Sequence, residues 1–268
     1  MKIFSIPGIN GLGKTKGCEK TPKLIIETLK EIYTSEKGNF INSKLLDIEN
    51  LELESLNVLE NNEKIFSIAF ENFKKRGKFL FLGGDHSISY LLVKSFFEVC
   101  KLRKRESCLI VFDAHPDCMK PIDKKIPTHE EWLRALVEAG FPAKNILLVG
   151  VRNSWKDEIV FLKENKILFM DVDKLLLDVE DACDTIMEFA SGKELYVSLD
   201  IDVVDPVFAP GTGYCEPGGL TSRQLIYLFK RISKMKNLNA VDLVEINSEK
   251  DKNNLTIKLG AKILSELI

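Results

Sequence analysis

The sequence DAHPD at residues 113–117 offers three metal-binding side chains at alternate positions. It follows directly on the apolar run CLIVF, which indicates a strand that ends there. Alternate residues of an extended segment point the same way, so Asp113, His115 and Asp117 can face one pocket. A polar turn with a capping aspartate is the simpler interpretation. It is harder to sustain for three such residues directly after a strand.

Two further strand ends carry residues of the same kind. Asp200 and Asp202 follow an apolar run and lie on one face of an extended segment. Two buried carboxylates without a partner are costly, so they need a cation. His86, in the sequence GGDHS, follows two glycines that allow a sharp turn, although a lone loop histidine is a weak signal. Asp205, before a proline, indicates a turn rather than a ligand.

Together these strand ends supply two of the three histidines in the chain and four aspartates: His86, Asp113, His115, Asp117, Asp200 and Asp202. An oxygen-rich set with imidazole and no thiolate favours Mn²⁺, with Mg²⁺, Fe²⁺ and Co²⁺ as alternatives, over a thiolate zinc site. Six ligands with shared carboxylates are too many for one ion. We therefore expect a bridged pair of metal ions.

The elements that must position these residues alternate along the chain. Apolar runs that indicate strands lie at 2–6, 44–48, 78–82, 108–112, 145–150, 167–170, 195–199 and 240–246. Helical periodicity lies between them, at 22–33, 61–76, 87–100, 130–139, 158–164, 179–190, 222–235 and 254–267. Most runs lack strict alternation, which is typical of strands buried on both faces. The pattern predicts one three-layer α/β/α domain over residues 1–268, around a mainly parallel sheet with its site at the carboxyl ends of the strands.

Composition narrows the classes of partner. The 268 residues carry a net charge of −2, which gives no electrostatic reason to expect nucleic acid or an anionic membrane. The sequence shows no signal-peptide pattern and no apolar run near the roughly 20 residues of a membrane span, so we expect a soluble, cytoplasmic protein. The six cysteines form no CxxC pair and are expected to be reduced and mostly buried. The polar segment 49–62 is expected to be a surface excursion.

The motifs GGDHSIS, DAHPD and SLDIDVVDPVFAPGTG resemble, in order and spacing, those of the ureohydrolase family, which includes arginases, agmatinases and guanidino-acid hydrolases. The early GLGKTKGCEKTP and the late VDLVEIN extend the resemblance over nearly the whole chain. It implies an arginase-like fold with a central eight-stranded sheet, two Mn²⁺ per subunit and a homo-oligomer, a trimer or a hexamer.

The resemblance also implies roles for single residues. One manganese would be held by His86, Asp113, Asp117 and Asp200, and the other by Asp113, His115, Asp200 and Asp202, with Asp113 and Asp200 bridging. His129 would aid substrate binding and proton transfer, although a residue at a helix start is the simpler interpretation. Glu245 would receive the guanidinium group of the substrate, where a salt bridge to a local lysine is the alternative. Asp202 would accept or pass a proton, and the products would be urea and an amine.

The tail of the substrate is less determined. The loop after DAHPD lacks the serine, threonine and asparagine set with which arginases grip an amino acid. Trp155, expected to bind substrate, and the sequence CEPGG resemble agmatinases, so agmatine is the first choice. Arginase is the second choice, because KGCE resembles its early loop. Lys120, Lys124 and Lys125 would make the entrance positive, which favours guanidino acids such as 4-guanidinobutyrate.

Two other classes remain as alternatives. A deacetylase-type amide hydrolase shares this fold but uses one zinc, and the retained His115 and Asp202 argue against it. A non-catalytic relative would ordinarily have lost a ligand, and no ligand position is missing here. Metal analysis combined with an assay of urea release separates these classes.

Overall fold

A single sheet of eight parallel strands forms the centre of the protein, as predicted. The computed structural model describes residues 1–11, 13–53 and 57–268. The sheet order is β2-β1-β3-β8-β7-β4-β5-β6. The strands are β1 (Lys2–Ile6), β2 (Asp47–Asn50), β3 (Phe79–Gly83), β4 (Ser107–Phe112), β5 (Ile146–Val151), β6 (Leu168–Asp171), β7 (Glu194–Asp200) and β8 (Leu238–Val244).

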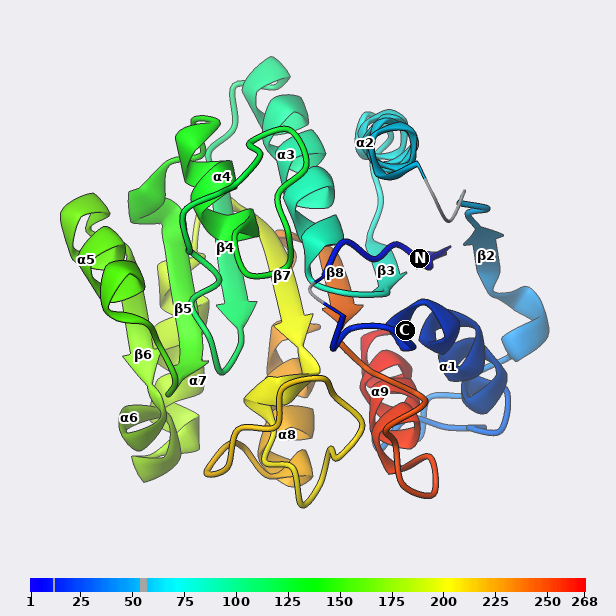
Figure 1. The fold of residues 1–268 in the computed structure, drawn as a ribbon. Helices are drawn as coiled ribbons and strands as arrows, with labels where there is room; N and C mark the ends of the chain where they lie inside the picture. Colours follow the sequence, from blue (N-terminus) through cyan, green and yellow to red (C-terminus); the bar gives the residue numbers. More distant parts are fainter. Residues whose placement is uncertain (12, 54–56) are drawn as a thin grey trace.

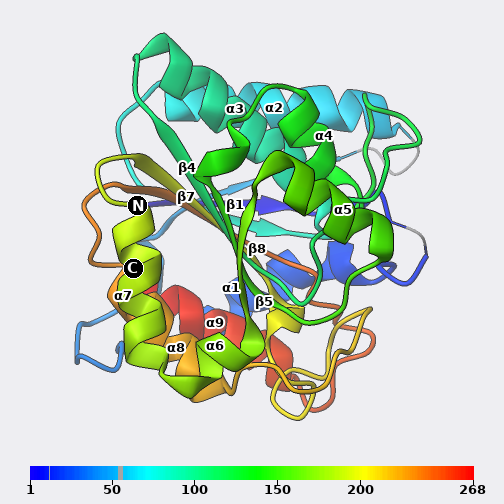
Figure 2. The same ribbon diagram turned by 90° about the vertical axis from the view of Figure 1, so that its left-hand side faces the viewer.

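Helices cover both faces of this sheet (Figures 1 and 2). One face is covered by α2 (Val58–Phe73), α3 (Ser87–Leu102), α4 (Trp132–Glu138) and α5 (Lys156–Asn165). The other is covered by α1 (Thr21–Leu29), α6 (Val172–Leu177), α7 (Val179–Phe189), α8 (Ser222–Ile232) and α9 (Leu255–Leu267). Among the described helices, none combines the length and the apolar character needed to cross a membrane.

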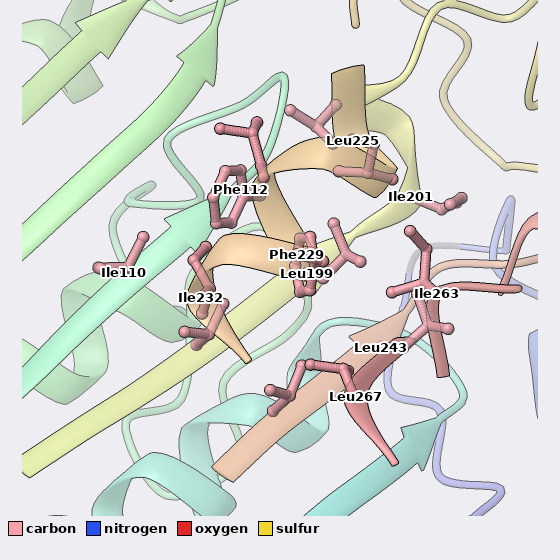
Figure 3. Packing of buried hydrophobic residues seen from close by; sticks show 14 of the residues in the cluster. Ile110, Phe112, Leu199, Ile201, Leu225, Phe229, Ile232, Leu243, Ile263 and Leu267 are labelled. Atoms are coloured by element: carbon pink, nitrogen blue, oxygen red, sulfur yellow. The ribbon is translucent and has the colours of Figure 1, made fainter. Parts of the chain in front are cut away.

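Burial on both faces explains why the central strands lack alternation. In β4, Ile110 and Phe112 belong to the core on the side of α8 and α9, whereas Leu109 and Val111 belong to the core beneath α3 and α4. Figure 3 shows Phe112 facing Phe229 of α8, with ring centroids 5.3 Å apart. Close packing on both sides holds the carboxyl end of β4 in one position.

Local details differ from the predicted elements. The second strand was expected at 44–48, but β2 begins at Asp47, because residues Ser43–Leu45 form a 3₁₀ turn capped by Asn42. Helix α6 was not predicted, since its six residues are too few to show a helical period. Of the predicted excursion at 49–62, residues 54–56 lie outside the described part. The residues after them start α2, where the side chain of Asn57 accepts the N–H of Glu60.

Sheet order decides which strand ends meet. β3, β8, β7 and β4 are consecutive neighbours, so four segments distant in sequence end side by side. Gly84, after β3, allows a close approach of the early loop: an added Cβ would lie 2.1 Å from the carbonyl oxygen of Gly8. The N–H of Glu245, after β8, donates to the carbonyl of Gly84 at 2.9 Å. The early loop and these two strand ends are therefore joined at one place.

Candidate metal centre and active site

Three carboxylates converge on one nitrogen of His86, at the start of α3. Its Nδ1 lies 3.1 Å from Asp113, 2.9 Å from Asp117 and 3.3 Å from Asp200. All four residues are buried. His86, Asp113 and Asp200 form one group whose ligand atoms lie within 4.8 Å of one another.

His115 belongs to a second group of the same kind. Its Nδ1 lies 3.0 Å from Asp202 and 3.5 Å from the Oδ1 of Asp113. Asp113 is therefore shared: Oδ1 faces His115 and Oδ2 faces His86. This position suits a bridging carboxylate. Asp200 lies in the first group only, so its bridging role stays a prediction.

Ser198 and Asp242, beneath the site, offer an acceptor for a proton on the Nε2 of His86. The Nε2 of His86 lies 3.0 Å from the Oγ of Ser198, and that hydroxyl donates to Asp242 at 2.6 Å. Because the hydroxyl proton is directed to Asp242, the Oγ accepts from Nε2–H. With this proton on Nε2, Nδ1 is the atom that a metal ion could take in place of a second proton. Tyr196 and Ser89 also donate to Asp242, at 2.8 and 2.9 Å, which fixes its orientation.

This donor set fits a metal ion. In the part of the chain that the structure describes, His86 Nδ1 and Asp113 Oδ2 are buried and have no hydrogen-bond partner. A nitrogen lone pair that faces carboxylate oxygens is repelled by them unless a proton or a metal ion lies between. Imidazole and carboxylate ligands without thiolate suit Mn²⁺ and related ions. The residues present therefore form two groups that could hold a metal ion, and the groups share Asp113.

The carboxylates are held in place by the protein. Backbone N–H groups donate to three of them: His115 to Asp113 at 2.6 Å, Ala114 to Asp202 at 3.0 Å, and Asp202 to Asp200 at 2.8 Å. The indole N–H of Trp132 donates to Asp117 at 3.0 Å. Asp117 adopts a left-handed backbone conformation with φ of 49°, as does Glu245 with φ of 63°. Such conformations are costly for residues other than glycine and concentrate at functional sites.

The buried carboxylates of the cluster repel one another, and this repulsion shifts their pKa values. Burial and the charges of Asp202 and Asp113 raise the pKa of Asp200 well above its ordinary value. Burial and Asp113 also raise the pKa of Asp117, to about 7. Asp113 has the opposite shift: burial alone would raise its pKa, but His115 and His86 lower it. The cluster thus carries more carboxylate charge than its two histidines can neutralise.

His129 and Glu245 meet beside the two metal-binding groups. His129 Nδ1 lies 3.5 Å from Glu245 Oε1, and both residues are buried. The same Oε1 accepts the backbone N–H of His86 at 2.9 Å, which ties Glu245 to a proposed metal ligand. The thiol of Cys18 lies 3.9 Å from the other oxygen, Oε2.

His129, Glu245 and four of the six proposed metal ligands line one cavity of about 340 Å³. Its size suits a small molecule. It is lined by Lys14, His115, Asp117, Met119, His129, Glu130, Asn153, Trp155, Glu158, Asp200, Asp202, Tyr214, Glu216 and Glu245. Trp155 is on this wall with 70% of its surface exposed, so its substrate contact stays a prediction.

Other residues singled out in the sequence lie elsewhere. Lys120, Lys124 and Lys125 are absent from the cavity wall, and Lys124 pairs with Glu138 of α4 at 2.7 Å. The pairing of Lys124 with Glu138 weakens its part in a positive entrance, and the expectation for the loop stays a prediction. Asp205 accepts the N–H groups of Val207 and Gly218 and stabilises a turn, as expected.

The cysteines behave as ordinary thiols. All six are free, and five are buried: Cys18, Cys100, Cys108, Cys118 and Cys183. Only Cys215 is exposed. The expectation of reduced, mostly buried cysteines agrees with this distribution.

Several residues of the site gave no usable signal in the sequence. Ser198 and Asp242 lie inside strands that were identified by their apolar neighbours. Lys14 and Tyr214 lie in loops, where a lysine or tyrosine ordinarily means solvent exposure. Asp85 is the exception, because its place next to His86 in GGDHS could have indicated a role in the site. In the structure it is fully buried and accepts the N–H groups of Asn10 and Ser87.

The fold and the site together are those of an α/β protein with a candidate metal centre at the carboxyl ends of parallel strands. A model of the arginase family matches residues 1–268, so the chain belongs to the arginase family. Members of this family are hydrolases that act on amidino C–N bonds.

Individual relatives agree with this membership. The chain is 30% identical over 200 residues to an agmatinase of Bacillus subtilis, a match that covers 74% of this chain and 66% of the relative. It is 33% identical over 190 residues to the mitochondrial arginase 1 of rice (Oryza sativa subsp. indica), covering 70% of this chain and 54% of the relative. The matches thus span about half to two thirds of these relatives' own lengths. In fold, the chain is similar to the crystal structure of formimidoylglutamase from Bacillus subtilis, with a TM-score of 0.87, 23% identity, and coverage of 99% of this chain and 85% of the other.

Proposed function

We propose that this chain is a hydrolase that uses two Mn²⁺ ions to cleave a guanidino compound into urea and an amine. The observation that carries the proposal is the adjacency of two ligand groups that share Asp113 with the Glu245–His129 pair, on one cavity. A carboxylate for a planar cation and a site for two metal ions are the two elements that such a reaction requires.

Five of the six proposed ligands belong to the two ligand groups, and the sixth, Asp117, lies 2.9 Å from His86 Nδ1. One ion would be held by His86, Asp113, Asp117 and Asp200, and the other by Asp113, His115, Asp200 and Asp202. When bound, the ion pair supplies an activated water and positive charge at the reacting centre. The carboxylates hold their orientation through backbone N–H donors, so the ligand set is preorganised.

The remaining chemistry belongs to side chains beside the ligands. Glu245 binds the guanidinium group, since its carboxylate is fixed by the N–H of His86 and has further lone pairs for N–H donors. His129, in contact with Glu245, donates a proton to the departing amine. Asp202 accepts or passes a proton of the attacking water.

The tail of the substrate divides the candidates within the family. Trp155 on the cavity wall and the agmatinase relatives support agmatine as the first candidate. Arginine is the second, supported by the arginase relatives. A guanidino acid is the third candidate. A one-zinc deacetylase is less supported, because His115 and Asp202 complete a second ligand group.

The test is urea release from a panel of guanidino compounds by the Mn²⁺-loaded protein, with bound metal measured in parallel. Asp200→Ala should lose bound manganese and abolish urea release, because each proposed ion loses a ligand. Asp205→Asn is the matched control: it lies a few residues away but only stabilises a turn, so activity should be retained. Full activity of Asp200→Ala would contradict the two-metal assignment.

A further inference from the structure

Arg152, the residue after β5, donates hydrogen bonds from its guanidinium group to five backbone carbonyl oxygens. The acceptors are the carbonyls of Pro217 at 3.1 Å, Gly150 at 3.3 Å, Val203 at 3.4 Å, Asp202 at 2.7 Å and Glu216 at 2.5 Å. Gly219 leaves room for this group, because an added Cβ would lie 2.8 Å from its Nη2. Arg152 therefore joins two segments, the turn that carries Asp202 and the loop that carries Glu216.

The backbone of Arg152 holds a third segment. Its N–H donates to the carbonyl of Ala114 at 2.9 Å. Ala114 lies between Asp113 and His115, and its own N–H donates to the carboxylate of Asp202 at 3.0 Å. Asp113, His115 and Asp202 are the second ligand group. Arg152 is thus bonded to the backbone of both segments that supply this group.

Asn153 continues the same support on the outer side of His115. Its N–H donates to the carbonyl of Ala114 at 3.1 Å, and its side-chain amide donates to Glu216 Oε1 at 2.7 Å. That oxygen lies 3.4 Å from His115 Nε2. The Nδ1 of His115 faces the cluster, so Glu216 offers an acceptor to the other ring nitrogen. An acceptor at this place orients a histidine that binds a metal ion.

The first ligand group has a different support. His86 Nε2 lies against Ser198 of β7, which donates to Asp242 of β8. The five acceptors of the Arg152 side chain all lie outside these two strands. The two groups share Asp113 but are oriented by separate sets of hydrogen bonds.

We propose that Arg152 and Asn153 are positioning residues of the second ligand group, so that they determine the affinity for one of the two metal ions. This inference rests on the two-ion site of the proposed function and adds that its ions are supported independently. Partners outside the ligand set strengthen metal binding because they hold the ligands in the binding geometry. The planar fork of arginine can reach several fixed acceptors at once, whereas a lysine ammonium cannot reproduce this pattern.

The test is a titration of the metal-free protein with Mn²⁺, followed by calorimetry. Arg152→Lys keeps the charge and loses the fork. It should weaken one ion about 10-fold or more and the other clearly less. Electron paramagnetic resonance should then show single Mn²⁺ ions where the unchanged protein shows a coupled pair. A general loss of stability would weaken both ions alike, so the difference between them separates positioning from a merely structural role.

A second change identifies the weakened ion. Asp202→Asn removes a ligand proposed for the second ion alone and keeps the backbone carbonyl that Arg152 contacts. In this background, Arg152→Lys should leave the affinity of the remaining ion unchanged. Arg103→Lys is the matched control, because Arg103 also donates to backbone carbonyls, those of Phe73 and Lys74, away from the cavity. It should change neither affinity.

The outcomes separate this inference from the proposed function. Equal loss of both ions in Arg152→Lys, no loss of either, or further loss in the Asp202→Asn background overturns the positioning role. If circular dichroism shows that Arg152→Lys does not fold, Asn153→Ala decides, because it removes the donor to Glu216 and should weaken the same ion. If the unchanged protein binds fewer than two ions, the two-ion site itself is wrong and the inference falls with it.

Discussion

At the scale of single residues, the contact between His129 and Glu245 favours the protonated, positively charged form of His129. Burial opposes a charge on the imidazole, but the hydrogen bond and the charge of Glu245 raise the pKa of His129 from 6.5 to about 9. A histidine with this pKa holds its proton at neutral pH. That is the state required of an acid that protonates a leaving amine.

The pH dependence of activity follows from this sign. The protonated ring is present below its raised pKa and is lost as pH rises through about 9, so kcat/KM should fall above that pH. His129→Asn should lose about 100-fold in activity together with this alkaline limb. In Glu245→Gln, an NMR titration should place the pKa of His129 nearer 6.5, because the charge that raises it is gone. A ring that titrates near 6.5 in the unchanged protein would contradict the assignment.

Residue chemistry could be predicted where several metal-binding side chains stand close in the sequence. DAHPD is such a case, since alternate positions on a strand end must point together. Ser198 could not be found in this way, because its partners His86 and Asp242 lie far along the chain. The loop lysines show the converse: Lys124 is near the metal motif in sequence, but it pairs with Glu138.

At the scale of elements, three of them build the support beneath His86. Strand β7 contributes Ser198, strand β8 contributes Asp242, and helix α3 contributes Ser89 and has His86 as its N-cap residue. β7 and β8 are neighbours in the sheet, with Ser198 paired in register with Asp242. This register places the Ser198 hydroxyl between Asp242 and His86 Nε2, where it can accept the Nε2 proton and leave Nδ1 for a metal.

Removing the Ser198 hydroxyl tests this register. Ser198→Ala deprives His86 Nε2 of its acceptor, so Mn²⁺ affinity should fall about 10- to 100-fold, as when the partner of a ligating histidine is lost. Ser89→Ala is the matched control: it removes a hydroxyl that donates to Asp242 and lies 3.4 Å from the Oγ of Ser198, but it keeps the Ser198 hydroxyl that faces His86. Its loss of affinity should be clearly smaller. Mn²⁺ titration calorimetry measures both, and equal affinities would contradict the proposed role of Ser198.

The elements themselves were largely predictable, because long apolar runs and helical periods are local properties. The prediction failed where elements are short or their ends are set by caps. Helix α6 begins at an Asp171 cap and ends after six residues, and β2 is displaced by a capped turn before it. Strand order is a different matter: the resemblance supplied the eight-stranded fold, whereas the placement of β8 between β3 and β7 came from the structure.

At the scale of the whole molecule, the sheet gathers negatively charged side chains at the carboxyl ends of its central strands. Asp113, Asp117, Asp200 and Asp202 lie at the carboxyl ends of the adjacent strands β4 and β7, and all four are buried. Burial and neighbouring charges raise the pKa of Asp200, and a carboxyl whose pKa is raised by folding destabilises the folded state at pH values above its ordinary pKa. Bound cations would remove this repulsion, so metal binding should be coupled to the stability of the entire chain.

Thermal unfolding with and without Mn²⁺ tests this coupling. Mn²⁺ should raise the Tm of the unchanged protein, by an amount that grows with concentration and corresponds to about 2.7 kcal/mol per site at 100 times Kd. Asp200→Asn removes one repelling charge, so its metal-free form should unfold at a higher temperature than the metal-free unchanged protein. It should then gain far less from Mn²⁺, because a ligand is missing. Asp205→Asn, which affects only a turn, should shift the Tm equally in both conditions. If Mn²⁺ stabilises Asp200→Asn as much as the unchanged protein, Asp200 is no ligand. The stability of the fold would then not depend on a metal ion bound by Asp200.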